Sequence, residues 1–406
     1  MIHMESCPKQ YMSETQRAVP PDVTLSRVRK LLPAAGITRV ADITDLDRIG
    51  IPVFSSIRPA AGSGAITVYN GKGATPVEAE VSAIMEGIER CSAEPDDLDP
   101  TLLKGRYSEL SIGRTALDPA ELILPAGVPA DIPVSWTGGY DIIRNEDVLV
   151  PAHAVFHPLA MSHGRLFRTN TNGLASGNTM EEAVFHGLME VIERDAWSLA
   201  EMHGRPCPIV IGIEDGIAAG LMDKFASAGV EIIIRDMTSD IGVPTFAAVS
   251  DDTELRDPAL LTIGMGAHTN PEVALLRALT EVAQSRLTQI HGAREDTDTA
   301  YVRKKIGYER TKRLNRRWFE DAEKKDFSTI ASSDSADFLV DINLVLDRLR
   351  DTGIGRAVVA DLTREHIGVP VVRVIVPGLE VFAMDPERIG ARCRDAGNSR
   401  ISRSKH

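Results

Sequence analysis

The feature that most constrains the fold is a chain segment that occurs three times. Stretches that begin at Ala35, Ala228 and Thr352 each contain a Gly suited to end a helix, a β-branched run, Asp-x-Thr, a short polar turn, Ile-Gly-(Ile/Val)-Pro and a second apolar run. An amphipathic stretch precedes each copy: "LSRVRKLLPA", "LMDKFAS" and "INLVLDRLRD". We therefore expect three units, each made of a helix, a strand, a tight connection and a second strand.

Each copy carries one aspartate directly after its first strand: Asp42, Asp236 and Asp361. Three equivalent carboxylates could be three ligands. Asp followed two residues later by Thr is also a common way to organise a turn, because both side chains hydrogen-bond to nearby backbone groups. We favour the turn and expect these aspartates to belong to the scaffold.

A second series of segments alternates with the first. "TPVEAEVSAIMEGIER" (75–90) and "TMEEAVFHGLMEVIER" (179–194) align without a gap and share their Thr, Met, Arg and several Glu positions. "NPEVALLRALTEVAQSR" (270–286) is a looser third copy, with Glu281 and Gln284 in the places of the Glu-x-x-Glu pair. These patterns predict an α/β (α+β) fold in which three related helix–strand–strand units form one composite domain.

The helix expected from Glu181 to Ala200 is apolar nearly all round, as buried helices are. It nevertheless carries polar side chains at i, i+4, i+8 and i+11, on one stripe: Glu182, His186, Glu190 and Glu193. Buried carboxylates are costly unless a cation compensates them. An exposed row of salt bridges is the alternative, but repetition of the motif on apolar helices argues against it.

Two kinds of cation could compensate these carboxylates. Hard divalent ions such as Mg²⁺ accept several carboxylate oxygens, and Arg90, Arg194 and Arg277 lie on the same helices. Several carboxylates with intervening arginines suit Mg²⁺ bound to a polyphosphate, since the metal neutralises oxygens that the arginines orient. Ordinary nucleotide motifs are missing, because the glycines and hydroxyl residue of a P-loop are not found around Lys72.

Composition limits the classes of function. A formal charge of -13 argues against nucleic acid as the main partner, and no apolar run is long enough to cross a membrane. The four cysteines are scattered, so neither a disulfide framework nor a zinc site is indicated. We expect a cytoplasmic protein.

Three ordered motifs resemble those of the YcaO superfamily: "SAIMEGIER" from Ser82, "NGLASGNTMEEAVFHGLMEVIERDA" from Asn172, and "RALTEVAQSR" from Arg277. The resemblance runs from about Arg17 to Pro377. It implies the YcaO fold, whose ATP site is built from glutamate-bearing helices. The chain also lacks a Pro-x-Pro-x-Pro tail and ends "CRDAGNSRISRSKH". In this respect it is similar to the stand-alone methanogen branch, the methanogenesis marker proteins that form thioamides.

The resemblance implies ATP and Mg²⁺ as cofactors and assigns the site residues. The implied metal ligands are Glu86, Glu89, Glu182, Glu190 and Glu193. The implied nucleotide contacts are Arg17, Thr24, Ser82, Asn178, Arg194, Arg277 and Glu281. Arg17 and Thr24 differ from the Lys and Ser of a relative but keep their spacing. Arg194, Arg277 and Glu281 are also the implied catalytic residues.

The implied domain layout has a helix/strand unit over residues 1–60 that contributes to the ATP site. A YcaO domain follows over 61–390, and a polar, flexible tail over 391–406.

The resemblance implies ATP-dependent activation of a peptide backbone amide. In the methanogen branch the implied product is thioglycine in the alpha subunit of methyl-coenzyme M reductase, made with sulfide or a sulfur carrier. A TfuA-like partner and a homodimer are further implied possibilities. Two other functions stay open: an azoline-forming cyclodehydratase acting on Cys, Ser or Thr of a ribosomal peptide, and a non-catalytic nucleotide-binding partner subunit.

Overall fold

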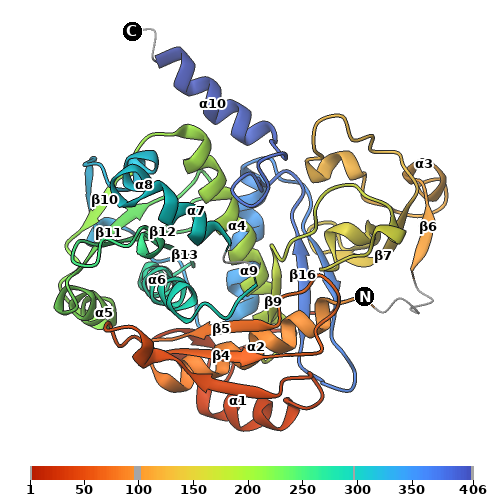
Figure 1. The fold of residues 1–406 in the computed structure, drawn as a ribbon. Coiled ribbons are helices and arrows are strands. Elements are labelled where there is room, and N and C mark those ends of the chain that lie inside the picture. The colour runs from red at the N-terminus through yellow and green to blue at the C-terminus, as the bar shows by residue number, and fades with distance from the viewer. Residues whose placement is uncertain (1, 96–101, 296–297, 404–406) are drawn as a thin grey trace.

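Each of the three repeated segments folds into a helix followed by two antiparallel strands, which confirms the predicted units (Figure 1). The computed structural model describes residues 2–95, 102–295 and 298–403. The repeated elements are α1 (Pro21–Val28), β3 (Arg39–Asp42) and β4 (Val53–Ile57); α5 (Gly216–Ser227), β11 (Val230–Asp236) and β12 (Thr245–Asp252); and α9 (Phe338–Asp351), β15 (Val358–Asp361) and β16 (Val371–Ile375).

The turn between the paired strands has the same chemistry in all three units. In each, an aspartate Oδ1 accepts a hydrogen bond of 2.9 Å from the backbone N–H of the Thr two residues later: Asp42–Thr44, Asp236–Thr238 and Asp361–Thr363. The Gly of Ile-Gly-(Ile/Val)-Pro has φ between +67° and +74° at Gly50, Gly242 and Gly368, a conformation that glycine adopts without a steric penalty. The aspartates are turn residues, as predicted.

A third strand and a second, buried helix complete each unit. The strands are β5 (Val68–Lys72), β13 (Ile263–Ala267) and β9 (Leu174–Ser176), and the helices that follow them are α2 (Pro76–Ala93), α6 (Pro271–His291) and α4 (Met180–His203). These helices are the second repeated series. Their N-terminal Thr75, Asn270 and Thr179 accept hydrogen bonds from free N–H groups of the first turn.

The third unit is assembled from segments far apart in the chain. In the first two units the strands pair in chain order, β3–β4–β5 and β11–β12–β13. In the third, β16 pairs with β9, which precedes it in the sequence, through the partners Val371–Ser176, Val372–Ala175 and Arg373–Leu174. The helix α4 therefore closes a unit whose other half begins at Phe338.

The remaining elements extend these sheets. β6 (Leu103–Gly105) and β8 (Glu146–Pro151) pair with β7 (Val134–Asp141), which pairs with β15. β10 (Ile209–Ile211) and β14 (Lys324–Asp326) continue the sheet of the second unit, and β1 (Tyr11–Met12) pairs with β2 (Gln16–Arg17). The other helices are α3 (Tyr107–Leu110), α7 (Asp298–Ile306), α8 (Tyr308–Leu314) and α10 (Ala391–Arg403).

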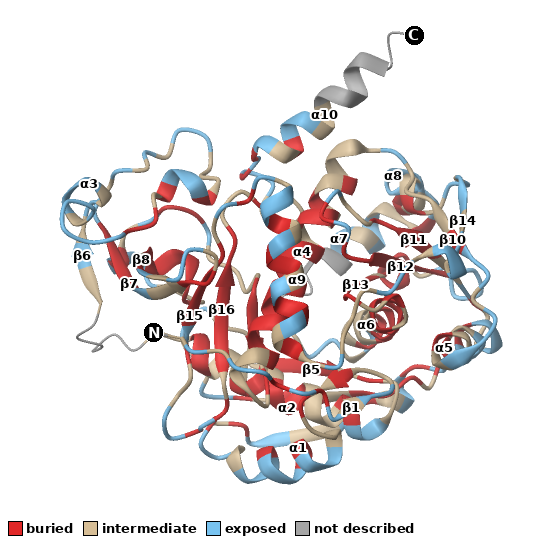
Figure 2. Ribbon diagram, turned by 180° about the vertical axis from the view of Figure 1, so that it is seen from behind, coloured by how far each residue is buried: buried red, intermediate tan, exposed pale blue. Residues whose placement is uncertain are grey.

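Helix α4 lies at the centre of the molecule and is largely buried (Figure 2). One side of it, with Phe185 and Leu188, belongs to an apolar cluster that includes Phe338 of α9 and Val374 of β16. Burial of such side chains stabilises each by about 1.5–3 kcal/mol. This packing holds the polar stripe of α4 in a fixed position.

Segments near both ends of the chain contact the body. Near the N-terminus, Lys9 forms a fully buried ion pair of 2.6 Å with Asp341 of α9. The region expected as a tail from residue 391 begins as α10, where Arg392 pairs with Asp195 of α4 and Cys393 is buried. The helix then projects from the body (Figure 1). Residues 404–406 of the expected tail lie outside the described residues.

The proposed division at residue 60 falls within one sheet, because β5 pairs with β4. Among the helices that the structure describes, none has both the length and the apolar character needed to cross a membrane.

Candidate functional site

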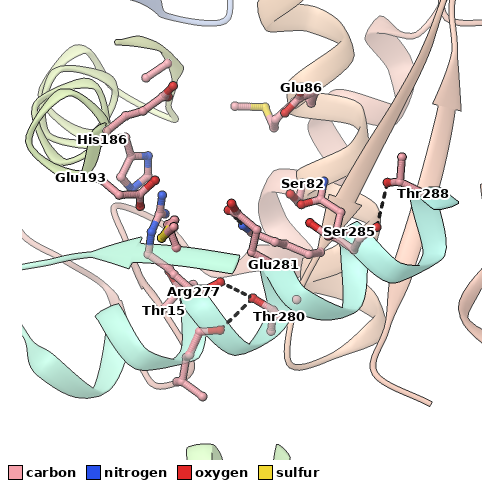
Figure 3. Close-up of a pocket in the computed structure, with 18 of the residues that line it drawn as sticks. Thr15, Ser82, Glu86, His186, Glu193, Arg277, Thr280, Glu281, Ser285 and Thr288 are labelled. Atoms are coloured by element: carbon pink, nitrogen blue, oxygen red, sulfur yellow. Dashed lines mark hydrogen bonds and ion pairs between the residues drawn. The ribbon is translucent and has the colours of Figure 1, made fainter. Parts of the chain in front are cut away.

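The buried helices of the three units enclose a cavity of about 710 Å³. All of the predicted site residues line it: Arg17, Thr24, Ser82, Glu86, Glu89, Asn178, Glu182, Glu190, Glu193, Arg194, Arg277 and Glu281. Figure 3 shows Glu86 of α2, Glu193 of α4 and Glu281 of α6 directed from three sides toward one space. Because each repeated unit contributes one of these helices, the three helix faces that carry carboxylates meet at one cavity.

Three acidic side chains of α2 and α4 have partners on their own helices or on β9. Glu86 pairs with Arg90 at 2.7 Å, and Glu193 lies 3.4 Å from Arg194. Glu89 accepts a hydrogen bond of 3.3 Å from the Ser176 hydroxyl. The arginines predicted as compensating cations thus lie beside the acids, as the sequence indicated for Arg90 and Arg194.

The N-terminal segment covers one end of α4. Thr24 donates a hydrogen bond of 2.9 Å to Asn178, which in turn donates to both oxygens of Glu182. Arg17 lies 3.8 Å from Glu182 and 2.5 Å from Nε2 of His186. Arg17, Thr24 and Asn178, predicted as nucleotide contacts from separate motifs, therefore form one connected network.

Two arginines retain a donor with no partner. The Nε atoms of Arg194 and Arg277 are buried and have no hydrogen-bond partner among the described residues. A buried unsatisfied N–H is costly, about 1–3 kcal/mol. On α6, Glu281 pairs with Lys72 of β5 instead of with Arg277. The free donors fit a ligand rich in acceptor oxygens, as the phosphates of ATP are.

Two of the carboxylates, Glu89 and Glu190, hold protons more readily than an ordinary glutamate does. Burial, followed by the nearby Glu86, raises the pKa of Glu89 well above its usual range. Burial also raises the pKa of Glu190, against the lowering effect of Arg194. Burial and the adjacent Arg17 lower the pKa of His186, so this histidine is neutral at physiological pH. A bound cation would relieve the repulsion between Glu86, Glu89 and Glu190, and the residues fit Mg²⁺ in this respect.

The predicted metal ligands share the cavity without converging on one point. Among the residues that the structure describes, no group of three acidic, histidine or cysteine side chains is close enough to hold a metal ion. Glu86, Glu193 and Glu182 pair instead with Arg90, Arg194 and Asn178, respectively. The assignment of Glu86, Glu89, Glu182, Glu190 and Glu193 as ligands stays a prediction.

The raised pKa values lead to a stability prediction. Because the folded, metal-free protein binds more protons at Glu89 and Glu190 than the unfolded chain does, its free energy of unfolding falls as pH rises from the ordinary glutamate range through the raised pKa values. Mg²⁺ should therefore increase this free energy more at about pH 8 than at about pH 5.5. Urea unfolding with EDTA or Mg²⁺ at both pH values measures the difference.

The variant Glu89→Gln serves as the internal check of that prediction. It removes one proton-binding group, so the benefit of Mg²⁺ at the higher pH should shrink. An equal benefit of Mg²⁺ at both pH values in the wild-type protein would contradict the coupling between protons and metal.

Several lining residues were not assigned from the sequence. Two of them are His186, which belongs to the polar stripe, and Lys72, around which the sequence has no P-loop. Ser285 and Thr288 of α6 also line the cavity. They stand at i+4 and i+7 from Glu281, so helical periodicity alone would have placed them on its face.

Comparison with known proteins places the chain among relatives with a matching fold. The family model described as YcaO cyclodehydratase, ATP- and Mg²⁺-binding, matches residues 70–380. The solved structure of YcaO from Methanopyrus kandleri, bound with AMPPCP and Mg²⁺, superposes with a TM-score of 0.80. The two are 32% identical, and the match covers 95% of this chain and 98% of that one.

Two further relatives match over most of their length. An uncharacterized protein of Methanothermobacter thermautotrophicus is 52% identical over 389 residues, which are 94% of this chain and 99% of the relative. An uncharacterized protein in the tfuA 3′ region of Rhizobium leguminosarum bv. trifolii is 35% identical, with 90% of this chain and 89% of the relative covered. The similarity is thus distributed over all three units.

Proposed function

This chain belongs to the YcaO family of ATP- and Mg²⁺-dependent enzymes that modify peptide backbones, and we propose that it converts a backbone amide of its substrate into a thioamide. The observation that carries this proposal is the single cavity in which carboxylates and arginines of three helices meet. The proposed substrate is a glycine of the methyl-coenzyme M reductase alpha subunit, with sulfide or a sulfur carrier as the sulfur source.

Two relatives support the thioamide assignment over the broader family activity. One is a methanogen protein whose match covers 94% of this chain. The other lies in the tfuA 3′ region of its genome, which agrees with a TfuA-like partner in the proposed reaction. The alternative is azoline formation, which the cyclodehydratase description of the family favours.

The proposed reaction makes the amide oxygen a leaving group. Hydrosulfide adds to the carbonyl carbon, and the π electrons of the C=O bond move to oxygen. That oxyanion attacks the γ-phosphorus of ATP, and the bond to the β-γ bridging oxygen breaks to release ADP. The sulfur then loses its proton to phosphate as the C–O bond breaks and C=S forms. The overall products are the thioamide, ADP and inorganic phosphate.

The residues of this chain bind and orient the phosphates in that reaction. The unpartnered Nε donors of Arg194 and Arg277 would hold phosphate oxygens and stabilise the charge that develops during transfer. Thr24, Asn178 and Arg17 would fix the nucleotide against α4. Mg²⁺, held by the five glutamates, would neutralise the phosphate oxygens.

Intact-mass analysis of a glycine-containing reductase peptide tests the proposal. The peptide is incubated with the protein, ATP, Mg²⁺ and sulfide, while ADP is followed in parallel. We expect a sulfide-dependent mass gain that matches exchange of one oxygen for sulfur. Loss of one water from a Cys, Ser or Thr peptide without sulfide would assign azoline formation instead. ADP release with no modified peptide, also in the presence of a TfuA-like protein, would contradict the thioamide assignment.

A further inference from the structure

A second cavity, of about 60 Å³, lies beside the large one and is called the small cavity below. Its polar lining comes from Glu121, Asn170, Asn172, Arg373 and Arg388. The rest is mainly apolar, with Val191 of α4 and the chain from Val374 to Leu379. A volume of this size suits one small ion with its nearest waters.

The two cavities share walls. Glu190 lines the large cavity and Val191, the next residue of α4, lines the small one. In the loop before β9, Thr171 faces the large cavity, whereas Asn170 and Asn172 face the small one. A ligand in the small cavity would therefore lie behind the glutamates assigned to Mg²⁺.

Arg373 of β16 has a donor without a partner at the small cavity. Its side chain is 4% exposed, and it donates to the carbonyl oxygens of Ala154 at 3.1 Å and Asn170 at 2.8 Å. Its Nη1 has no hydrogen-bond partner among the described residues. Asn172, on the same cavity, has an unpartnered side-chain Oδ1, which is an acceptor and would suit a water beside the anion.

Arg388 brings a second buried cation to the same cavity. It is 6% exposed, donates to the carbonyl oxygens of Leu122 and Ile123, and stacks on Phe167 with 3.9 Å between the guanidinium carbon and the ring centre. Neither Arg388 nor Arg373 forms an ion pair with a carboxylate of the described chain. Two buried guanidinium groups thus face one cavity with carbonyl partners alone.

The unpartnered donor of Arg373 favours an anion between these groups. Burial lowers the pKa of both Arg373 and Arg388 to about 10. At Arg373 the charge of Glu190 raises the pKa, and the charges of Arg90 and Arg388 lower it. Arg235 offers a contrast, since it is also buried and bonded to carbonyls. Each of its three guanidinium nitrogens, however, donates to a backbone carbonyl oxygen. Arg235 therefore has no nitrogen without a partner, whereas Arg373 has its Nη1 available for a ligand.

We propose that Arg373 and Arg388 form a binding site for one small monovalent anion, and that during turnover this anion is hydrosulfide, the sulfur nucleophile. The identification of this anion as hydrosulfide rests on the proposed function. The apolar lining suits a polarisable and weakly hydrated ion, and Glu121 on the cavity wall would repel a doubly charged phosphate. The position behind Glu190 places the nucleophile next to the phosphate site.

Bromide tests the anion site independently of any reaction. Crystals of the full chain are soaked in sodium bromide, and anomalous scattering is measured at the bromine edge. We expect a peak within hydrogen-bond distance of Nη1 of Arg373, absent in Arg388→Met and retained in Arg388→Lys, which keeps the charge. A wild-type cavity that holds water alone would overturn the site.

The sulfide dependence of thioamide formation tests the identity of the anion. Arg388→Met should raise KM for sulfide about 10-fold or more and leave KM for ATP unchanged. Arg348→Met is the matched control, because Arg348 also donates to a carbonyl oxygen, that of Gly242, but lies outside both cavities. An unchanged KM for sulfide in Arg388→Met would overturn hydrosulfide as the occupant.

The two measurements separate failure of this inference from failure of the proposed function. Bromide binding without thioamide formation on any peptide would keep the anion site and reject hydrosulfide together with the proposed function. Thioamide formation with no bromide peak and an unchanged KM for sulfide would reject the site and leave the proposed function standing.

Discussion

Replacing Glu190 by glutamine is expected to reduce ATP turnover about 100-fold or more while leaving the fold intact. The substitution keeps the size of the side chain and removes its charge. That charge lies among Arg194, Arg90 and Arg373 and next to Glu193. Its loss removes one proposed Mg²⁺ ligand and leaves the positive charge of the three arginines less compensated. ADP release at increasing Mg²⁺ concentrations measures the effect, and higher Mg²⁺ should restore part of the rate.

A control on the same helix separates this effect from general damage to α4. Glu181 precedes Glu182 in the first turn, accepts a hydrogen bond from the backbone of Glu5 and does not line the cavity. Glu181→Gln should therefore turn over ATP at the wild-type rate. The assignment of Glu190 to the metal shell fails if Glu190→Gln keeps both its turnover and its Mg²⁺ dependence.

Replacing Gly173 by alanine is expected to destabilise the protein by about 3–5 kcal/mol. Gly173 has φ +79°, where an added Cβ is strained. That Cβ would also overlap the carbonyl oxygen of Val374 and lie 2.7 Å from a methyl group of Val191. Since Gly173 precedes β9, the clash would separate β9 and α4 from β16. Urea unfolding measures the loss, and ATP binding should weaken with it.

Gly242→Ala isolates the steric part of that loss. Gly242 has a similar φ of +74°, but an added Cβ there would meet nothing within 4 Å. Its cost should be the backbone strain alone, about 1 kcal/mol. Equal destabilisation by both substitutions would mean that close packing between Gly173 and β16 does not control the stability of the third unit.

The sequence could place the predicted site residues on shared helix faces because helical periodicity is a local property. Glu182, Glu190 and Glu193 had to share one face of α4, and the matching positions of α2 had to share another. Their meeting in one cavity could be inferred from the repeat. Their actual partners could not, since Glu281 pairs with Lys72 of another unit and Glu182 is bonded to Asn178.

The C-terminal segment and Arg373 of β16 show the limit of pattern reasoning. The polar composition after residue 390 indicated a tail, yet Arg392 and Cys393 are held against α4 and its neighbours. Arg373 is the one polar residue of the apolar strand β16, and its position beside Arg388 is a property of the tertiary structure. In both cases the partner lies far away in the sequence, so no local signal reports it.

The sequence by itself determined the repeated units and their turns. Asp-x-Thr, the left-handed glycine and the helix caps act through bonds between residues a few positions apart, and such bonds form in any context that allows the helix and strands. Tertiary structure decided that β9 and α4 complete the unit begun by α9. Pairing between strands as far apart in the sequence as β9 and β16 cannot be predicted from local sequence patterns. It depends on which register buries Phe185, Phe338 and Val374 together.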